Sequence, residues 1–313
     1  MDLLASLISL SFLAAIVRHA LPLSLAATGG MLSERSGVIQ IALEGLMVSG
    51  AFAGACGAYY GGGALAGIAA GVAVGALLGL AYAWIVVKLE ADQIVTGVAL
   101  NLLAEGLTRY LLKVVFGSAA NSKDLDQVSA LWSSWTVGDL LANPLVWICI
   151  LAAVGVHLAL SRSRAGLRLR AAGDHPAAAE ALGVDVARVR LGAVALAGAL
   201  AGLAGVWMVL ALRSYSSGII GGRGYIALAA VIFGAWRPLP VLGATVLFGL
   251  FKALEVELRT SPSVLEVIPA GYIMTLPYVM PVLALVLWSR RGRSRTTAPR
   301  ALGRPLSEGH SAR

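Results

Sequence analysis

LGAVALAGALAGLAGVWMVLAL (residues 191–212) is an apolar run without a single charged side chain. A helix needs about 20 such residues to cross the hydrocarbon core of a bilayer. Two further runs, 62–87 and 268–288, are also apolar and of similar length. These runs predict an α-helical membrane protein with several crossings, because a membrane β-barrel would show short strands of alternating polarity instead.

The composition agrees with this class. The chain of 313 residues is 58% hydrophobic and 13% charged, whereas soluble domains are about 25% charged. We predict an all-α fold, a polytopic helical bundle of the inner membrane with about eight or nine membrane segments. Arg18, His19 and Pro22 interrupt the first of the expected helices, which lie near 3–28, 38–58, 62–87, 92–116, 144–160, 188–212, 224–236, 239–257 and 268–288.

The positive charge is concentrated in two places, the loop 162–190 and the tail 290–313. They hold 13 of the 24 basic residues, namely Arg162, Arg164, Arg168, Arg170, Arg188, Arg190, Arg290, Arg291, Arg293, Arg295, Arg300, Arg304 and Arg313. The positive-inside rule places both in the cytoplasm. Segment 117–143, with one Lys and three Asp, is expected outside. We therefore predict a single transmembrane domain, 1–289, followed by a basic cytoplasmic tail, with no sign of a nucleic-acid interface.

This topology constrains the segment 213–267. Helix 188–212 begins inside and ends outside, while the last helix must run inward, so 213–267 has to begin and end outside. Residues 224–236 are too few to cross a bilayer, and the prolines in 237–240 turn the chain back. We therefore expect a re-entrant hairpin of broken helices over 224–257.

Polar side chains interrupt the apolar framework in a helical pattern. Gln40 and Glu44 are four residues apart, as are Asn101, Glu105 and Arg109, so each set shares one helix face. Glu105 and Arg109 are placed to pair within their helix. Charges at such depth normally face a cavity or pair with one another. The candidates for a translocation path or gate are Glu34, Arg35, Gln40, Glu44, Asn101, Glu105 and Tyr225.

Two roles remain open for these residues. They line a hydrophilic path, or they hold neighbouring helices together by hydrogen bonds. A faint likeness between GVIQIALEGLMVSGAF (37–52) and GYIALAAVIFGAW (224–236), each after a glycine-rich break, favours a path. Transporters are often built from repeats whose broken helices meet at the substrate, although chance similarity between such helices is the alternative.

Motifs for catalysis and nucleotide binding are absent from the sequence. There is no GxxxxGK[ST], HExxH, GxSxG or CxxC pattern. Cys56 and Cys149 lie inside apolar runs and are expected to be small core residues. We expect no enzymatic activity, cofactor or metal, so work against a gradient would need a partner or an ion gradient.

The polar stretch AAGDHPAAAEALGVDVARVR (171–190) differs from everything around it. Asp174 is a good N-cap, Pro176 suits a first helical turn, and Gly183 suits a left-handed stop. Asp185 would cap the following long helix. A helix of about two turns is marginal alone, so we expect it to dock against a surface. An ordinary interfacial loop is the alternative.

Four segments together resemble a known family. They are RAAGDHPAAAEALGVDVARVRLGAVALAGALAGLAG (170–205), SERSGVIQIALEGLMVSGAF (33–52), GYIALAAVIFGAWRPLPVLGA (224–244) and RALGRPLSEG (300–309). The resemblance is to bacterial ATP-binding-cassette (ABC) import permeases of the branched-chain amino acid/ribose type, specifically the shorter permease of the nucleoside/simple-sugar branch. One departure is Gln40-Ile41-Ala42, where the family usually has Asn followed by Ile-Gly.

The resemblance implies a type II ABC importer-like permease in the bacterial inner membrane, surrounded by lipid, which conducts nucleosides or simple sugars. It implies a heterodimer with a second permease, cytoplasmic ATPase subunits and a substrate-binding lipoprotein or periplasmic protein. The ATPases would grip a coupling helix that includes Gly173, Asp174, His175, Pro176, Ala178, Glu180 and Gly183. The rival hypothesis is an ion-driven secondary transporter with Glu105 as the proton carrier.

Overall fold

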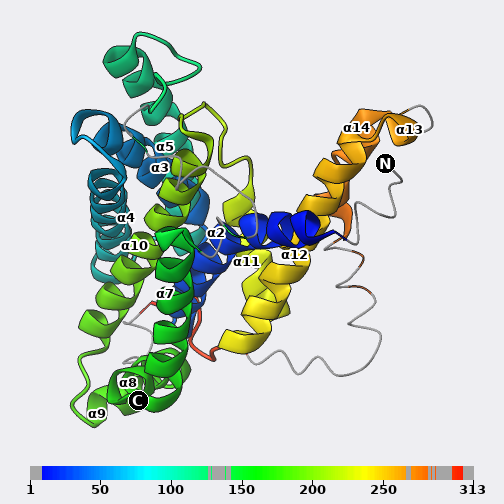
Figure 1. Ribbon diagram of the computed structural model, residues 1–313. Helices are drawn as coiled ribbons and strands as arrows, with labels where there is room; N and C mark the ends of the chain where they lie inside the picture. The colour runs from blue at the N-terminus through cyan, green and yellow to red at the C-terminus, as the bar shows by residue number, and fades with distance from the viewer. Residues whose placement is uncertain are drawn as a thin grey trace.

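The computed structural model describes residues 9–125, 128, 138, 142–265, 269–280, 283, 286 and 298–305. Every regular element in these residues is an α-helix (Figure 1). In chain order they are α2 (Leu10–Arg35), α3 (Leu43–Tyr60), α4 (Ala64–Lys88), α5 (Gln93–Phe116), α7 (Pro144–Arg162), α8 (Arg164–Asp174), α9 (Pro176–Ala181), α10 (Val186–Leu212), α11 (Arg223–Phe233), α12 (Pro238–Thr260), α13 (Pro262–Leu265) and α14 (Ala270–Ile273).

Five of these helices are long and apolar enough to cross a membrane: α2, α4, α7, α10 and α12. Each has at least 19 residues and at most two charged side chains in its most apolar 18-residue window. The helical membrane class predicted from the apolar runs is therefore confirmed. Helix α11 is apolar but has only 11 residues.

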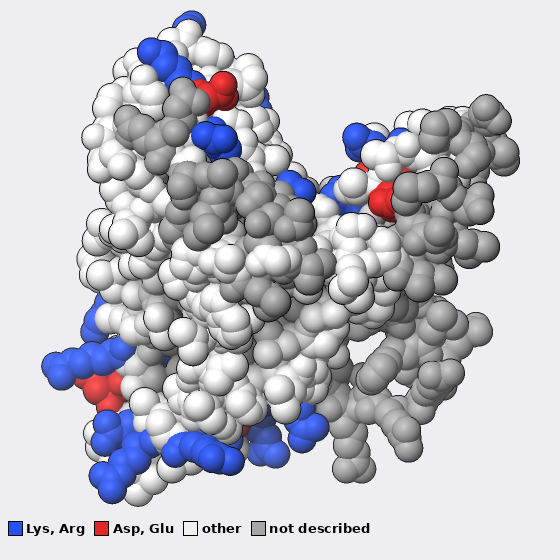
Figure 2. Space-filling view, in the orientation of Figure 1, with Lys and Arg blue, Asp and Glu red and all other residues white. Residues whose placement is uncertain are grey.

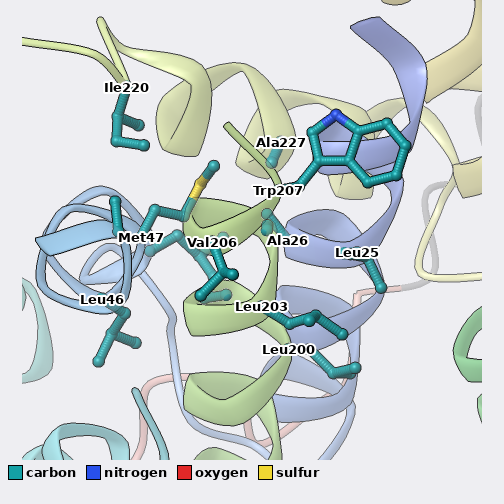
Figure 3. Close-up of a cluster of buried hydrophobic side chains, with 14 of the residues drawn as sticks. Leu25, Ala26, Leu46, Met47, Leu200, Leu203, Val206, Trp207, Ile220 and Ala227 are labelled. Carbon is teal, nitrogen blue, oxygen red and sulfur yellow. The ribbon is translucent and has the colours of Figure 1, made fainter. Parts of the chain in front are cut away.

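Helix α10 is the centre of the bundle. Figure 3 shows Leu203, Val206 and Trp207 of α10 between side chains of α2, α3 and α11. On another face, glycines of α10 meet glycines of α4: a Cβ atom on Gly202 would lie 3.1 Å from the Cα of Gly75. Small residues at such a contact let two helix backbones approach closely, which favours association inside a membrane.

The loops separate into two ends of the molecule. At one end, the start of the predicted external loop runs beside the segment that follows α10. The Ser122 amide donates to the Tyr215 carbonyl at 2.8 Å, and the Ser217 amide donates to the Ala120 carbonyl at 2.8 Å. Charge bias for the loop, and the parity of the expected crossings for the segment after α10, predicted the same side of the membrane for both, and the structure brings them together.

The arginine-rich segments lie at the opposite end, with α8 and α9. The Ala301 amide donates to the Gly173 carbonyl at 2.9 Å, and the Gly303 amide donates to the Gly37 carbonyl at 3.0 Å. Figure 2 shows Lys and Arg gathered along the lower edge of the molecule, where Figure 1 places α8 and α9. The loop and residues 298–305 of the tail therefore share one end, as their charge predicted.

The first helix differs from its expected range 3–28. Helix α2 continues through Pro22 and ends at Arg35, because packed membrane helices tolerate a proline whose freed carbonyl finds another partner. It also continues through Gly29, where an added Cβ would lie 2.8 Å from the Ala197 carbonyl oxygen of α10. Gly29 therefore serves close packing, and the helix breaks only at Ser36.

An unexpected helix, α8, ends inside the polar stretch. Ser163 caps α8 through a 3.0 Å bond from the Gly166 amide, and α8 includes Gly173 and Asp174 as its last residues. The predicted N-cap role of Asp174 is therefore wrong. His175 occupies the N-cap of α9 without a side-chain bond, because the helical turn of α8 closes from the His175 amide to the Ala171 carbonyl.

Other predictions about this stretch are confirmed. Pro176 lies in the first turn of α9, and Gly183 follows α9 with a φ of +80°. The Asp185 carboxylate caps α10 by accepting the Arg188 amide at 2.9 Å.

Cys149 is buried and Cys56 is partly buried against the core, as expected of small apolar residues. Of the expected last helix 268–288, the structure describes α14, a turn at 274–275 and helical residues 276–280; most of the remainder lies outside the described residues.

Candidate functional site

A cavity of about 300 Å³ lies among α3, α5, α11 and the segment between α10 and α11. Four of the predicted path residues, Glu44, Asn101, Glu105 and Tyr225, line it together. Glu44 comes from the first turn of α3, Asn101 and Glu105 from successive turns of α5, and Tyr225 from the first turn of α11. Residues separated by up to 181 positions thus form one wall because the breaks before α3 and α11 bring two helix starts together.

Glu44 links these two helix starts. Its Oε1 accepts the Gly222 amide at 2.8 Å and its Oε2 accepts the Gly224 amide at 2.7 Å. The carboxylate therefore satisfies free amides at the positive N-terminal end of α11, where a negative charge is favourable. Gly224 has to be glycine here, since an added Cβ would lie 2.6 Å from the Glu44 Cα. The two similar sequence segments, 37–52 and 224–236, thus touch at this carboxylate.

Asn101 joins three helices. Its Oδ1 accepts the Gly45 amide at 2.7 Å, and its Nδ2 donates to the Ile41 carbonyl at 2.9 Å and the Tyr225 hydroxyl at 3.1 Å. The side chain is nearly fully buried. Since an amide has only four hydrogen-bonding positions in all, these contacts fix its orientation and hold Tyr225 at the cavity wall.

Glu105 and Arg109 form a more open pair one turn further along α5. The Arg109 Nη2 lies 3.2 Å from the Glu105 Oε1, and the side chains are 56% and 60% exposed, respectively. The predicted pairing within the helix is confirmed. Arg109 also donates from Nε to the Ser217 Oγ at 3.1 Å. Such exposed pairs contribute less than about 1 kcal/mol to stability. Because the Glu105 side chain is also largely exposed, its carboxylate is accessible from the cavity.

The sequence did not indicate the rest of the polar lining. Tyr215 and Ser217 reach the cavity from the segment after α10, and Thr108 from α5. Burial raises the pKa of the Tyr215 phenol, which therefore remains protonated at neutral pH. The position of Thr108, three residues after Glu105 and so on the same helix face, was the one signal available from the sequence. Nothing local indicated the other two.

Three predicted path residues lie elsewhere. The Trp236 indole donates to the Glu34 Oε2 at 2.6 Å, and Arg35 donates from Nε to the Trp236 carbonyl at 2.8 Å. Gln40 is fully buried, and its side-chain nitrogen and oxygen have no hydrogen-bond partner in the described part of the chain. The structure therefore separates Glu34, Arg35 and Gln40 from the cavity, and groups the first two around the bend between α11 and α12.

The short helix α9 forms a second site at the arginine-rich end. Ala179 packs with Ala172 of α8 and Val186 of α10 in a small apolar cluster. His175, Ala178 and Gly183 are exposed, Pro176 and Glu180 are partly exposed, and Leu182 is 85% exposed. Gly173 is instead buried against the end of α2. One side of α9 is thus fixed to two helices, and the other carries small and apolar side chains on the surface.

Comparisons with known proteins add to this geometry. The family described as "Branched-chain amino acid transport system / permease component" matches residues 12–285. The chain is similar to the guanosine ABC transporter permease protein NupQ of Bacillus subtilis (strain 168), with 34% identity over 93% of this chain and 94% of that protein. It is also similar to the nucleoside ABC transporter permease protein NupC of Lactococcus lactis subsp. cremoris (strain MG1363), with 32% identity over 91% and 93%.

No solved structure gave a significant match. The family match nevertheless extends from the start of α2 to beyond α14, and so includes both the cavity and α9. The match covers most of the chain, and the two relatives align over nearly their whole length, so the family assignment does not depend on any single motif. The chain belongs to the permease component family of branched-chain amino acid-type transport systems.

Proposed function

We propose that this chain is the membrane-embedded permease subunit of an ABC importer and conducts nucleosides. Both relatives described above are named as ABC transporter permeases for guanosine or nucleosides, and each aligns over more than nine-tenths of this chain. The observation that carries the proposal within the structure is the shared cavity of Glu44, Asn101, Glu105 and Tyr225.

The proposed membrane arrangement follows from charge and helix length. The arginine-rich end, with α8, α9 and the tail, would face the cytoplasm of a bacterial inner membrane, as the positive-inside rule requires. Residues 1–289 would form one transmembrane domain of eight or nine segments, and 290–313 a cytoplasmic tail. Helix α11 would form the short arm of a re-entrant hairpin. Ala235 and Trp236, with φ values of +50° and +55°, turn the chain between α11 and α12.

In the cavity, we assign different roles to the two glutamates. Glu44 and Asn101 shape the wall, because their polar atoms are already bonded to backbone groups at or just before the starts of α3 and α11. Glu105 and the neighbouring Ser217 hydroxyl are positioned to hydrogen-bond the hydroxyls of a ribose. Tyr225 is 49% exposed, and its ring offers a face on which a nucleobase can stack.

The volume is compatible with this class of solute. A cavity of about 300 Å³ lies at the lower end of the usual range for small-molecule sites, roughly 300–1,000 Å³. In the proposed importer the second permease would complete the path, and a substrate-binding lipoprotein or periplasmic protein would deliver the nucleoside from outside.

The energy would enter through α9. We propose that separate ATPase subunits bind its exposed side, where Leu182 provides an apolar contact. Because Ala179 and Val186 tie α9 to α10, and α10 packs against α3, a movement of α9 would reach one of the helices that line the cavity. No ion is needed in this scheme, and relatives named as ABC transporter permeases do not favour the ion-driven rival.

The test is uptake in a host that lacks nucleoside transport. The chain is expressed with its ATPase, second permease and binding protein, and uptake of labelled guanosine, uridine and ribose is measured. We expect nucleoside uptake that unlabelled nucleosides abolish and ribose does not. Uptake of ribose alone would contradict the substrate class, and ATP-independent accumulation would contradict the importer.

A further inference from the structure

A second cavity, of about 360 Å³, lies at the arginine-rich end of the molecule. It is bounded by the last turn of α2, the last turns of α7, the middle of α8 and the bend between α11 and α12. Its basic side chains come from four separate segments: Arg35, His157, Arg170 and Arg237. None of its lining residues in the described part of the chain is acidic.

The three arginines have unused donors. Arg35 donates from Nε to the Trp236 carbonyl, and Arg170 donates from Nε to the Gly166 carbonyl at 3.4 Å. Within the residues that the structure describes, neither of these arginines nor Arg237 forms an ion pair. Asp174 attracts Arg35, but Arg170 and Arg237 both repel it. Like charges brought together around a cavity favour an anion that accepts from all of them.

Two neighbouring groups add to this preference. The Nδ1 atom of His157 is buried and has no hydrogen-bond partner. Helix α12 begins at Pro238 on the cavity wall, so the positive end of its dipole faces the same space.

Apart from Ser161, the rest of the lining is apolar. Leu160, Trp236, Pro238, Leu239 and Pro240 border the cavity, and Leu239 is 64% exposed beside it. Helix α8 separates polar from apolar residues and exposes Leu167 among its arginines, a pattern typical of helices that lie in the membrane interface. A free inorganic anion would use the arginines but not this apolar surface.

We propose that this cavity binds the headgroup of an anionic phospholipid, with the phosphate held by Arg35, Arg170 and Arg237 and the first part of the acyl chains against Leu239 and Leu160. Basic pockets between membrane helices on the cytoplasmic side are suited to such headgroups. The proposal requires that the chain lies in a membrane, but it does not depend on which solute is transported. The lipid would brace the bend of α11 and α12 against α2 and α8.

The test compares purified protein variants in detergent to which lipid is added. Phosphatidylglycerol and cardiolipin are titrated against phosphatidylcholine, and bound lipid is counted by native mass spectrometry alongside the thermal transition. Arg170→Gln and Arg237→Gln remove cavity charge without touching the Arg35–Trp236 bond. Arg168→Gln is the matched control, because Arg168 is exposed on the same helix outside the cavity lining.

We expect anionic lipid to bind and to raise the melting temperature, whereas phosphatidylcholine does neither. Each cavity variant should weaken anionic-lipid binding about fivefold, in line with roughly 1 kcal/mol per basic residue near an anionic headgroup, and Arg168→Gln should leave it within twofold. Equal losses in all three variants would overturn the site in favour of diffuse attraction. Equal protection by glycerol phosphate or inorganic phosphate would overturn the lipid in favour of a free anion.

Discussion

At the scale of single residues, Glu44 and Glu105 have different surroundings, although both line the same cavity. The Glu44 carboxylate accepts two backbone amides of the loop before α11 and its first turn, whereas Glu105 is exposed and pairs only with a flexible arginine in the described residues. We predict that Glu44→Gln lowers the free energy of unfolding by about 1–3 kcal/mol, because the amide that replaces one oxygen cannot accept a backbone hydrogen bond.

The matched change Glu105→Gln should alter stability by less than about 1 kcal/mol and yet raise the KM for nucleoside uptake. Thermal unfolding of the purified variants measures the first effect, and uptake kinetics at equal membrane abundance measures the second. If Glu44→Gln melts like the wild type, or Glu105→Gln transports normally, the two roles assigned here are wrong.

Two substitutions of Tyr225 separate the contribution of its ring to solute binding from that of its hydroxyl. Tyr225→Phe removes only the hydroxyl that accepts from Asn101, while Tyr225→Ala also removes the stacking face. We expect a small loss of affinity for nucleosides in the first variant and a loss of roughly 1–3 kcal/mol, or 5- to 150-fold, in the second. Equal losses in both variants would show that the hydroxyl, and not the ring, contacts the solute.

The sequence predicted this residue group in part. Glu44, Asn101 and Glu105 could be found because charged or amide side chains at four-residue spacing in an apolar helix are costly and must face polar surroundings. The spacing does not reveal which cavity a helix face meets, so Glu34, Arg35 and Gln40 were grouped with them although none of the three lines this cavity. Tyr215 and Ser217 could not be found, since their place depends on the pairing of 213–217 with the start of the distant loop 117–143.

At the scale of helices, the contact of α4 with α10 depends on glycine. A Cβ added at Gly202 would lie 3.1 Å from the Gly75 Cα and closer still to the Gly71 carbonyl oxygen, whereas nothing lies within 4 Å of a Cβ added at Gly192 of the same helix. We predict that Gly202→Ala destabilises the protein by about 1–3 kcal/mol through overpacking.

Gly192→Ala is the control and should be neutral or stabilising by up to about 1 kcal/mol, because alanine costs less backbone entropy in a helix. The melting temperatures of the two purified variants check this directly. Equal melting temperatures for the two variants would mean that α4 and α10 are not packed as closely as described.

The exposed side of α9 gives the next prediction. Ala178 is exposed and Ala179 is buried against α8 and α10, so the two neighbours test contact and packing separately. Ala178→Glu should abolish nucleoside uptake and ATPase stimulation by the binding protein while leaving membrane abundance normal. Ala179→Glu should lower abundance or stability as well, because it buries a charge.

Uptake, ATPase activity and quantified membrane levels in the assembled importer distinguish these outcomes. Normal coupling in Ala178→Glu would exclude α9 from the ATPase contact. Loss of abundance in Ala178→Glu equal to that in Ala179→Glu would mean that both residues act through folding.

The elements themselves were largely predictable, and the exceptions have physical causes. Long apolar runs determine α4, α5, α7 and α10 almost to their ends. Helix α8 escaped notice because its arginines and its Gly-Asp end are typical of a loop, and its helical form depends on the Ser163 cap and on packing of Gly173 against α2. Pro22 and Gly29 suggested breaks in α2 that neighbouring helices remove by packing.

At the scale of the whole molecule, the cavity and α9 lie toward opposite ends of one buried helix, α10. The cavity lies at the middle of α5 and beyond the end of α10, whereas α9 precedes the start of α10. Of the helices that form the cavity wall, α3 packs extensively against α10. Charge distribution predicted that the loop and the tail meet at one end, since both carry arginines for the same membrane face. It did not predict that the tail would bind Gly173 and Gly37, a contact formed by backbone groups.

The chain offers few candidates for a catalytic site of its own. The described residues contain no group of three or more His, Cys, Asp or Glu side chains that could hold a metal ion, and the sequence has no nucleotide-binding motif. In the proposed importer, separate ATPase subunits do the work on α9, in keeping with relatives named as ABC transporter permeases.

The most direct test is transport by vesicles that contain the permeases with or without their ATPase. With ATPase, ATP and binding protein, we predict accumulation of labelled guanosine above its external concentration; the same vesicles without ATPase should never exceed equilibration, whatever proton or sodium gradient is imposed. Accumulation against a gradient by the permeases alone would contradict the account.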